Sequence, residues 1–223
     1  MDSKDILLVD KPAGWTSFDV CAKIRGKIRR DYIEKGEKPT KRQLRVGHAG
    51  TLDPFATGLL IVLLGDECKK ADDFLKQDKV YEATFTLGTT STTGDPEGDL
   101  VAASEHQPGL DEIKSVLQQF TGKITQTPPA YSAVKVNGQR AYRLARDGKK
   151  VEIPSREVTV YSIDLVSYDY PNLKLVAHVS SGTYIRSLAE DIGSALGTGA
   201  YCSELRRTAI GKWSIDQVST WLQ

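Results

Sequence analysis

The sequence predicts an α+β (mixed α/β) fold in which flanking helices pack on a largely antiparallel mixed sheet. Segments with strand-like alternation follow one another without regular helices between them, and amphipathic helical segments stand apart from them. Of the 223 residues, 39% are apolar and 26% are charged, which is typical of a globular protein and argues against disorder. Because the sequence carries no internal repeat or clear linker, we expect a single domain spanning residues 1–223.

Each element follows from the spacing of its apolar residues. Strands are expected where apolar and polar residues alternate, or where a short apolar run is closed by glycine or proline: residues 6–9, 58–64, 81–87, 157–167 and 173–179. Helices are expected where apolar residues recur every three or four positions: residues 17–30, capped by Thr16 or Ser17, then 69–75, 110–120, 140–147 and 183–196. Turns or loops are expected at 11–14, 87–98 and Asn137-Gly138, with a mobile basic loop at 31–46.

The net charge of +1 conceals an uneven distribution. Residues 23–45 carry ten bases and three acids, residues 135–150 carry six bases and one acid, and residues 89–113 carry six acids and no Lys or Arg. Either basic block alone fits a solvated face equally well. Two basic blocks that converge on one surface would instead bind a phosphate backbone.

Three cysteines, Cys21, Cys68 and Cys202, lie far apart and form no C-x-x-C pair. This pattern argues against a zinc site or a disulfide framework and suits a reducing compartment. The acidic N-terminus is unlike a signal peptide, and the longest apolar run, Leu59–Leu64, is far shorter than the roughly 20 residues of a membrane span. We therefore expect a cytoplasmic protein without membrane association, and without a metal or cofactor because none of their sequence motifs occurs.

The segment Gly47–Gly58 holds the most unusual local sequence. Its three glycines allow backbone angles and close approaches that other residues avoid. Pro54 moves Asp53 away from helical geometry, so we expect the Asp53 carboxylate to project from a loop beside a strand. Taken alone, such an Asp-Pro pair more often forms an Asx turn, in which the carboxylate accepts hydrogen bonds from nearby amides.

Several ordered motifs extend over residues 5–213. They are Leu8–Gly14, Gly47–Gly58, Lys79–Glu82, Pro128–Lys135, Gly182–Arg186 and Leu205–Arg207. Together they resemble the signature of the TruB family of pseudouridine synthases. The resemblance implies the pseudouridine synthase fold with a central catalytic cleft. It also implies an isomerase that flips the T-loop uridine of tRNA (position 55) out of its stack and converts it to pseudouridine without a cofactor.

The same resemblance implies a role for each residue of a catalytic set. Asp53 matches the catalytic aspartate and Arg186 matches its buried arginine partner. Alternatively Arg186, which lies off the apolar stripe of its helix, forms a surface pair with Glu190. Tyr81 matches an active-site tyrosine that stacks on the target base and is proposed as a general base. Its alternation with Ala83 equally fits a core tyrosine.

Other positions in the motifs are expected to contact the RNA or to support its binding. His48 is expected to insert beside the flipped nucleotide rather than to transfer a proton. Leu205 is expected to form an apolar wall, and Asp95 to be a positioning residue, since its loop departs from a calcium-binding pattern. The candidates for phosphate contacts with the T-arm are Lys23, Arg45, Lys135, Arg140 and Arg143.

The chain departs from the usual pattern of bacterial family members at two places. It stops at Gln223, before the C-terminal PUA-type RNA-binding module that usually follows, and residues 31–46 form a longer segment than usual. Two other functions stay open: the catalytic subunit of a guide-RNA pseudouridylation particle, and a non-catalytic RNA-binding or tRNA-folding protein. We expect a monomer whose partner is tRNA.

Overall fold

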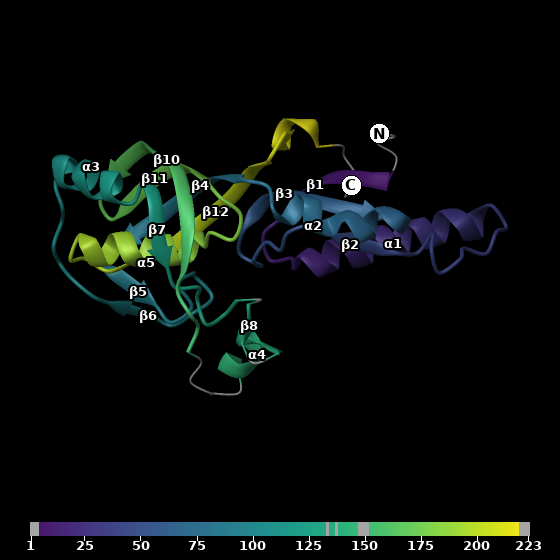
Figure 1. The fold of residues 1–223 in the computed structure, drawn as a ribbon, viewed down its shortest axis with the longest axis horizontal. Coiled ribbons are helices and arrows are strands. Elements are labelled where there is room, and N and C mark those ends of the chain that lie inside the picture. Colours follow the sequence, from purple (N-terminus) through teal and green to yellow (C-terminus); the bar gives the residue numbers. More distant parts are fainter. Residues whose placement is uncertain (1–4, 133, 137, 147–151, 219–223) are drawn as a thin grey trace. The chain divides into compact units, whose positions relative to one another are not determined.

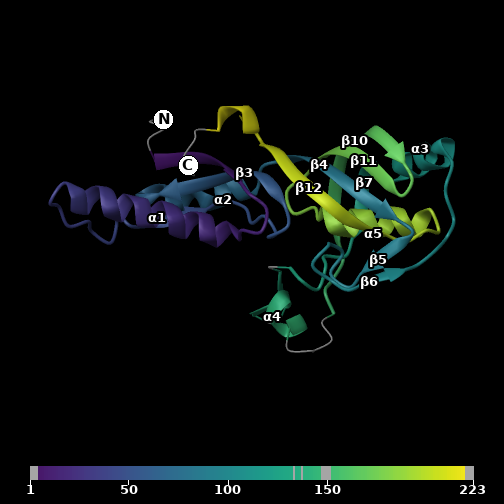
Figure 2. The ribbon, with the colours of Figure 1, turned by 180° about the vertical axis from the view of Figure 1, so that it is seen from behind.

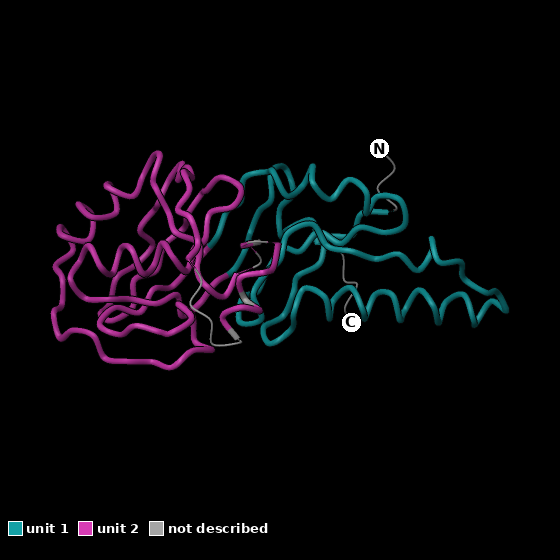
Figure 3. Tube along the Cα trace, turned by 60° about the horizontal axis from the view of Figure 1, so that its bottom comes forward, with its two compact units in different colours: residues 1–81, 206–223 teal, residues 82–205 magenta. Residues whose placement is uncertain are grey.

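The computed structural model describes residues 5–132, 134–136, 138–146 and 152–218. The chain divides into two compact units (Figure 3), namely unit 1 with residues 1–81 and 206–223 and unit 2 with residues 82–205. The chain passes from one unit to the other within two strands, β4 (Lys79–Leu87) and β12 (Ala200–Ile210). The expectation of a single domain stays a prediction.

Unit 1 is built on a sheet whose central strand is β3 (Thr57–Leu64) (Figure 1). This strand pairs antiparallel with β1 (Ile6–Lys11) and β2 (Val46–His48), and parallel with β12. Strand β13 (Trp213–Ser214) continues the sheet by pairing with β12. The helices of unit 1 are α1 (Ser17–Glu34), α2 (Ala71–Leu75), and the 3₁₀ turns η2 (Gly65–Lys70) and η3 (Ile215–Gln217).

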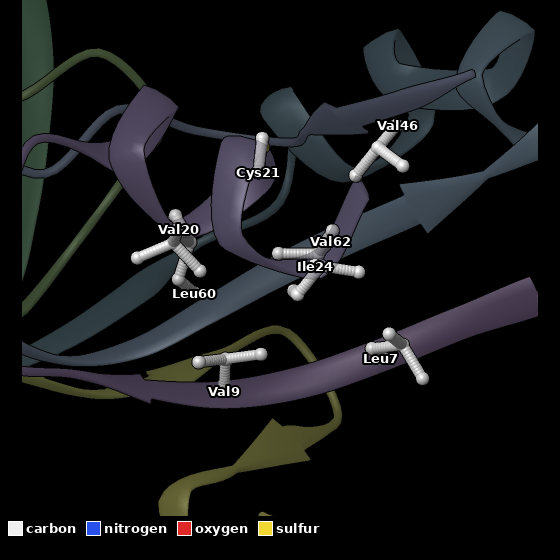
Figure 4. Close-up of a cluster of buried hydrophobic side chains, with 8 residues drawn as sticks. All are labelled: Leu7, Val9, Val20, Cys21, Ile24, Val46, Leu60 and Val62. Atoms are coloured by element: carbon white, nitrogen blue, oxygen red, sulfur yellow. The ribbon is translucent and has the colours of Figure 1, made fainter. Parts of the chain in front are cut away.

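Alternation along β1 and β3 gives unit 1 an apolar layer on each face of its sheet. One cluster lies between the sheet and α1 and is shown in Figure 4: Leu7, Val9, Val20, Cys21, Ile24, Val46, Leu60 and Val62. The neighbouring strand residues point the other way and form a second cluster with Ala49 of the loop after β2 and Phe74 of α2: Leu8, Ala49, Leu59, Ile61, Leu63, Phe74 and Ile210. Helix α1 begins at a capping box, in which Thr16 and Asp19 satisfy each other's backbone N–H groups.

Unit 2 contains the remaining strands, in the order β12-β4-β11-β10-β7. Here β10 (Arg156–Asp169) pairs antiparallel with both β11 (Asn172–Val179) and β7 (Gly122–Gln126). Helices α3 (Leu110–Gln119) and α5 (Ile185–Ala195) flank these strands (Figure 2), and both carry buried residues, such as Ile113 in α3 and Leu188 in α5. Two hairpins complete the unit: β5 (Thr89–Ser91) with β6 (Leu100–Ala102), and β8 (Lys135–Val136) with β9 (Gln139–Arg140), the latter followed by α4 (Ala141–Arg146).

The α+β class with a mostly antiparallel sheet and flanking helices is confirmed, and the expected strands and helices occur close to their predicted bounds. Helix α1 continues to Glu34, so the following loop starts later than expected. Part of the expected loop at 87–98 is strand β5, because its backbone pairs with β6. Strand β12 was not predicted, since charged residues interrupt its apolar pattern, yet one of them, Arg207, is buried. Asp147 and Gly148, the expected end of the basic helix, lie outside the described residues.

Across the described parts of the chain, no helix is both long and apolar enough to span a membrane.

Candidate active site

The loop that carries Asp53 connects β2 to β3 in unit 1, and buried polar side chains hold its backbone. Lys11, at the end of β1, is fully buried and donates from Nζ to the carbonyl oxygens of Trp15, Pro12 and Pro54 at 2.7, 2.9 and 3.2 Å. The carbonyl of Pro54 also accepts from the Gly14 N–H at 2.8 Å. The Lys11 ammonium thus ties the residue that follows Asp53 to the turn after β1.

Ser17, the first residue of α1, holds the residue that precedes Asp53. Its hydroxyl accepts from the Leu52 N–H at 2.8 Å and donates to the Leu52 carbonyl at 3.1 Å. Ser17 is 2% exposed and Leu52 is 3% exposed, so both bonds are shielded from water. Asp53 itself is partly buried and is therefore fixed through the backbone on either side.

Arg207 of β12 binds backbone carbonyls near both ends of the same loop. Its guanidinium donates to the carbonyls of Leu59 at 2.8 Å, Gly50 at 3.0 Å and Thr51 at 3.4 Å, and its side chain is 1% exposed. Gly58 is in the left-handed region at φ +101°, and a Cβ at that position would lie 2.3 Å from the Arg207 carbonyl oxygen. The parallel pairing of β12 with β3 therefore requires glycine at position 58.

The two buried cations carry a large desolvation cost, of several kcal/mol for each charged group. Charge-assisted hydrogen bonds to carbonyl oxygens offset this cost by about 1.5–3 kcal/mol each. Three such bonds are made by Lys11 and three by Arg207. The loop geometry thus depends on two buried cations that donate to backbone carbonyls. A neutral side chain could not bind three carbonyl oxygens as strongly.

His48 and Tyr81 also belong to unit 1. His48 lies in β2 and is half-buried, and within the described structure its Nδ1 is a buried atom that has no hydrogen-bond partner. Burial, and then the charge of Arg207, lowers the pKa of His48, so its imidazole is neutral at pH 7. Tyr81 is 9% exposed in β4, on the same side of the strand as Ala83 and Phe85. Their roles toward a substrate stay predictions.

Arg186 and Asp95 form a buried ion pair in unit 2. Arg186 lies in the first turn of α5, and its Nη1 donates to Asp95 Oδ2 at 3.0 Å, with side-chain exposures of 4% and 5%. The Arg186 guanidinium also donates to the carbonyls of Thr93 at 2.9 Å and Tyr131 at 2.8 Å. The Arg186 side chain is buried, and its charge also acts on the carboxylate of Glu190, the alternative partner. Its pairing with Asp53 stays a prediction.

Asp95 is held so that its carboxylate presents one oxygen to Arg186. The other oxygen, Oδ1, accepts from the Thr93 hydroxyl at 2.5 Å and from the Glu97 N–H at 3.0 Å. With 3% of the residue exposed, the carboxylate contacts protein rather than solvent. Asp95 therefore orients the Arg186 guanidinium.

Gln126 anchors the start of α5, the helix that carries Arg186. Its side-chain amide accepts from the Tyr184 N–H at 2.7 Å and donates to the Tyr184 carbonyl at 3.0 Å, as a neighbouring strand would. Tyr184 is the N-cap residue of α5, and its own side chain makes no capping bond. The amide of Gln126, which is 1% exposed, thus supplies the fixed starting point of the helix.

The sequence alone did not select Lys11, Ser17, Arg207 or Gln126 as site residues, although Ser17 was a candidate helix cap and Lys11 and Arg207 lie within the motifs. A signal for Arg207 was present, because a base between apolar strand residues needs buried acceptors. The same holds for Lys11, which ends the apolar run of β1 and precedes a proline. Ser17 and Gln126 carried no comparable signal, since their partners are distant in sequence.

The remaining predicted residues are distributed over both units. Leu205 is 8% exposed in β12. Lys23 in α1 is exposed, and Arg45 is exposed with its Nη1 at 3.6 Å from Asp66. Lys135 and Arg140 are backbone partners in the register of the β8–β9 hairpin, and Arg140 and Arg143 are exposed. Contact of these residues with RNA stays a prediction.

Among the described residues, no group of three or more His, Cys, Asp or Glu side chains is placed so that it could hold a metal ion. The cysteines Cys21, Cys68 and Cys202 are free thiols.

Two family models match the chain. Residues 38–185 match the model described as TruB family pseudouridylate synthase (N terminal domain). Residues 186–223 match the model described as tRNA pseudouridylate synthase B C-terminal domain. The two matches meet at Arg186, so the two units defined by compactness do not coincide with these models.

Curated relatives match nearly the whole chain. A protein of Chlamydia trachomatis named tRNA pseudouridine synthase B is 45% identical over 213 residues, which is 95% of this chain and 83% of that protein. A protein of Parabacteroides distasonis with the same name is 44% identical over 95% of this chain and 88% of that protein.

Among solved structures, a chain from the crystal structure of a Cbf5-Nop10-Gar1 complex has a similar fold. Its TM-score is 0.70 at 31% sequence identity. The match covers 94% of this chain and 50% of that chain, so the present chain spans half the length of this structural relative.

Proposed function

The chain belongs to the TruB family of pseudouridylate synthases, and we infer from this that it isomerises a uridine of tRNA to pseudouridine, at position 55 in the T loop. The observation that carries the proposal is the 45% identity, along 95% of the chain, to a protein named tRNA pseudouridine synthase B. The fixed backbone around Asp53 supports it, because a catalytic carboxylate must be held within a fraction of an ångström of its working position.

The reaction rearranges bonds without adding or removing atoms. The bond between N1 of uracil and C1′ of ribose breaks, the base rotates, C5 bonds to C1′, and the C5 proton is lost while N1 gains one. A carboxylate is suited to assist, because it can attack the electrophile and later leave. Asp53 is the proposed group, and both C6 of uracil and C1′ of ribose are open to it.

The other residues of the proposed site support Asp53 or the substrate. A guanidinium from Arg186 would favour the ionised form of Asp53 and fix its rotamer, and Asp95 keeps that guanidinium oriented. Tyr81 would stack on the uracil, and Leu205 would form an apolar wall. His48, neutral because of its lowered pKa, would insert beside the flipped nucleotide or stack on it without transferring a proton.

The proposed partner is the T-arm of tRNA, bound through phosphate contacts. Lys23, Arg45, Lys135, Arg140 and Arg143 are the proposed contacts. A guide-RNA particle subunit remains the second candidate because of the Cbf5 complex, but that match is at 31% identity and covers half of the solved chain. A non-catalytic RNA-binding protein would need the same surface without the reaction.

A tritium-release assay tests the proposal. Uridine labelled at C5 loses its label when C5 bonds to C1′, so wild-type protein should release tritium from a tRNA with a labelled T loop. Asp53→Asn should release none while binding the RNA as tightly as wild type. Asp99→Asn, which alters an exposed aspartate in unit 2, is the matched control and should behave as wild type.

Three outcomes would contradict the proposal in different ways. Release by Asp53→Asn at the wild-type rate would exclude Asp53 as the essential group. Release only after addition of a guide RNA would favour the particle subunit. Tight RNA binding without release under any condition would favour the non-catalytic RNA-binding protein.

A further inference from the structure

Residues 29–45, which we call the arm, contribute no buried residue to unit 1. They comprise the C-terminal part of α1 and the segment that returns to β2. In Figures 1 and 3 both pieces extend beyond the strands of unit 1. Ordering these residues costs roughly 1–2 kcal/mol of backbone entropy each. Since none of its residues is buried in return, and most are exposed, the surface of the arm is open to a partner.

The base of the arm is nevertheless fixed to the rest of unit 1. Arg25 in α1 donates to the carbonyls of Leu44 at 3.2 Å and Val46 at 3.1 Å, which ties the returning segment to the helix. Arg42 and Arg45 both pair with Asp66 in η2, at 2.5 and 3.6 Å. The arm is therefore a supported projection rather than a loose tail.

The charge of the arm is strongly positive. It holds seven bases and three acids, a formal charge of +4 on a chain whose total is +1. Arg42 and Arg45 form ion pairs with Asp66 at the base of the arm. The other bases are exposed and form no ion pair within the described structure: Arg29, Arg30, Lys35, Lys38 and Lys41. Exposed, unpaired cations on a projecting element are suited to a polyanion.

Helix α1 sets the distance between these cations and the proposed catalytic loop. Its first residue, Ser17, bonds to Leu52, the neighbour of Asp53. Ile33, near the tip of the arm, is 16 residues further along the same helix, which at 1.5 Å per residue is about 24 Å. We propose that the arm binds backbone phosphates of the substrate tRNA at about this distance from the target uridine. The proposal rests on the proposed function for the identity of the RNA.

Charge-neutralising variants test this contact. The arm variant carries Lys35→Gln, Lys38→Gln and Lys41→Gln. The matched control carries Lys76→Gln, Lys114→Gln and Lys174→Gln, which remove the same charge from exposed positions outside the arm. Because the arm buries no residue, both variants should unfold at the wild-type temperature.

Binding of unmodified full-length tRNA is measured at 50 and 200 mM salt. Three phosphate contacts predict a loss of about 2–3 in the slope of log affinity against log salt. The ratio of dissociation constants, arm variant over wild type, should then be about 16–64 times larger at 50 mM than at 200 mM salt. The control should keep the wild-type slope, and the arm variant should raise KM for tRNA while leaving kcat unchanged.

Hydroxyl-radical footprinting locates the contact on the RNA. Wild type and control should protect sugar residues about 24 Å from the target uridine, and the arm variant should lose that protection alone. Equal slopes for the arm and control variants would overturn the proposal, as would loss of protection confined to the target nucleotide. Arm-dependent binding by a wild-type protein that releases no tritium would overturn the proposed function and leave the arm contact standing.

Discussion

Asp95→Asn removes one charge from the buried Asp95–Arg186 pair and keeps the size of the side chain. In the native protein the pair is joined at 3.0 Å between Nη1 and Oδ2, with side-chain exposures of 4% and 5%. An asparagine oxygen can still accept from Thr93 and Glu97, as Oδ1 does now. Its NH₂ group then faces the Arg186 guanidinium, so a donor meets a donor.

The expected loss follows from the burial of the pair. Breaking a buried ion pair by removing one partner costs about 3–5 kcal/mol of unfolding free energy. The carbonyls of Thr93 and Tyr131 still accept from Arg186, so we expect the lower end, about 3 kcal/mol. We also expect slower tritium release, because the guanidinium loses the group that orients it.

Urea denaturation followed by circular dichroism measures the loss, with Asp99→Asn as the exposed control. The double variant Asp95→Asn/Arg186→Met should be less destabilised than the sum of the two single variants, because it leaves neither charge of the pair buried alone. A loss of less than about 1 kcal/mol for Asp95→Asn, or additive losses in the cycle, would refute the reasoning.

Three further predictions concern the loop around Asp53. Gly58→Ala should lower the melting temperature by forcing a Cβ to within 2.3 Å of the Arg207 carbonyl, at a cost of at least about 2 kcal/mol. Gly26→Ala, whose new Cβ meets nothing within 4 Å in α1, should raise stability by about 0.5–1 kcal/mol. Equal changes in stability for Gly58→Ala and Gly26→Ala would contradict a steric clash at position 58. Arg207→Lys keeps the charge but loses the planar guanidinium, so the unfolding free energy should fall by about 2–3 kcal/mol. Amide hydrogen exchange near residue 50 should accelerate, and exchange at the wild-type rate would contradict the role given to the Arg207–carbonyl bonds. Because the folded-state pKa of His48 lies below 6.5, the unfolded chain binds a proton first on acidification. The stability linked to His48 is thus complete above about pH 6.5 and declines below it, and His48→Gln should reduce the difference in unfolding free energy between pH 7.5 and 5.5.

Most secondary structure could be predicted because it depends on local patterns. The alternation at Tyr81, Ala83 and Phe85 predicts β4, and the spacing of Val20 and Ile24 predicts α1. Strand β12 escaped prediction because its buried Arg207 reads as polar in any local pattern. Its acceptors, the carbonyls of residues 50, 51 and 59, belong to a segment far away in the sequence.

The candidate site likewise contains residues that local motifs identify and contacts that depend on distant parts of the chain. The motif residues Asp53, Tyr81 and Arg186 could be selected from the sequence, since ordered motifs along one chain mark a family. That Asp95 pairs with Arg186 could not, because the pattern of α5 says nothing about a loop 91 residues away.

The sequence by itself determined the fold class, the family and the position of the proposed catalytic loop, because alternation, helical spacing and ordered motifs are properties of neighbouring residues. Only the tertiary structure decided what holds that loop. Lys11 and Arg207 bind backbone carbonyls, and every residue has a carbonyl, so no side-chain pattern identifies which ones a buried cation will reach. The arm was likewise a basic segment in the sequence, and it became a projecting surface only when the fold left it without a buried residue.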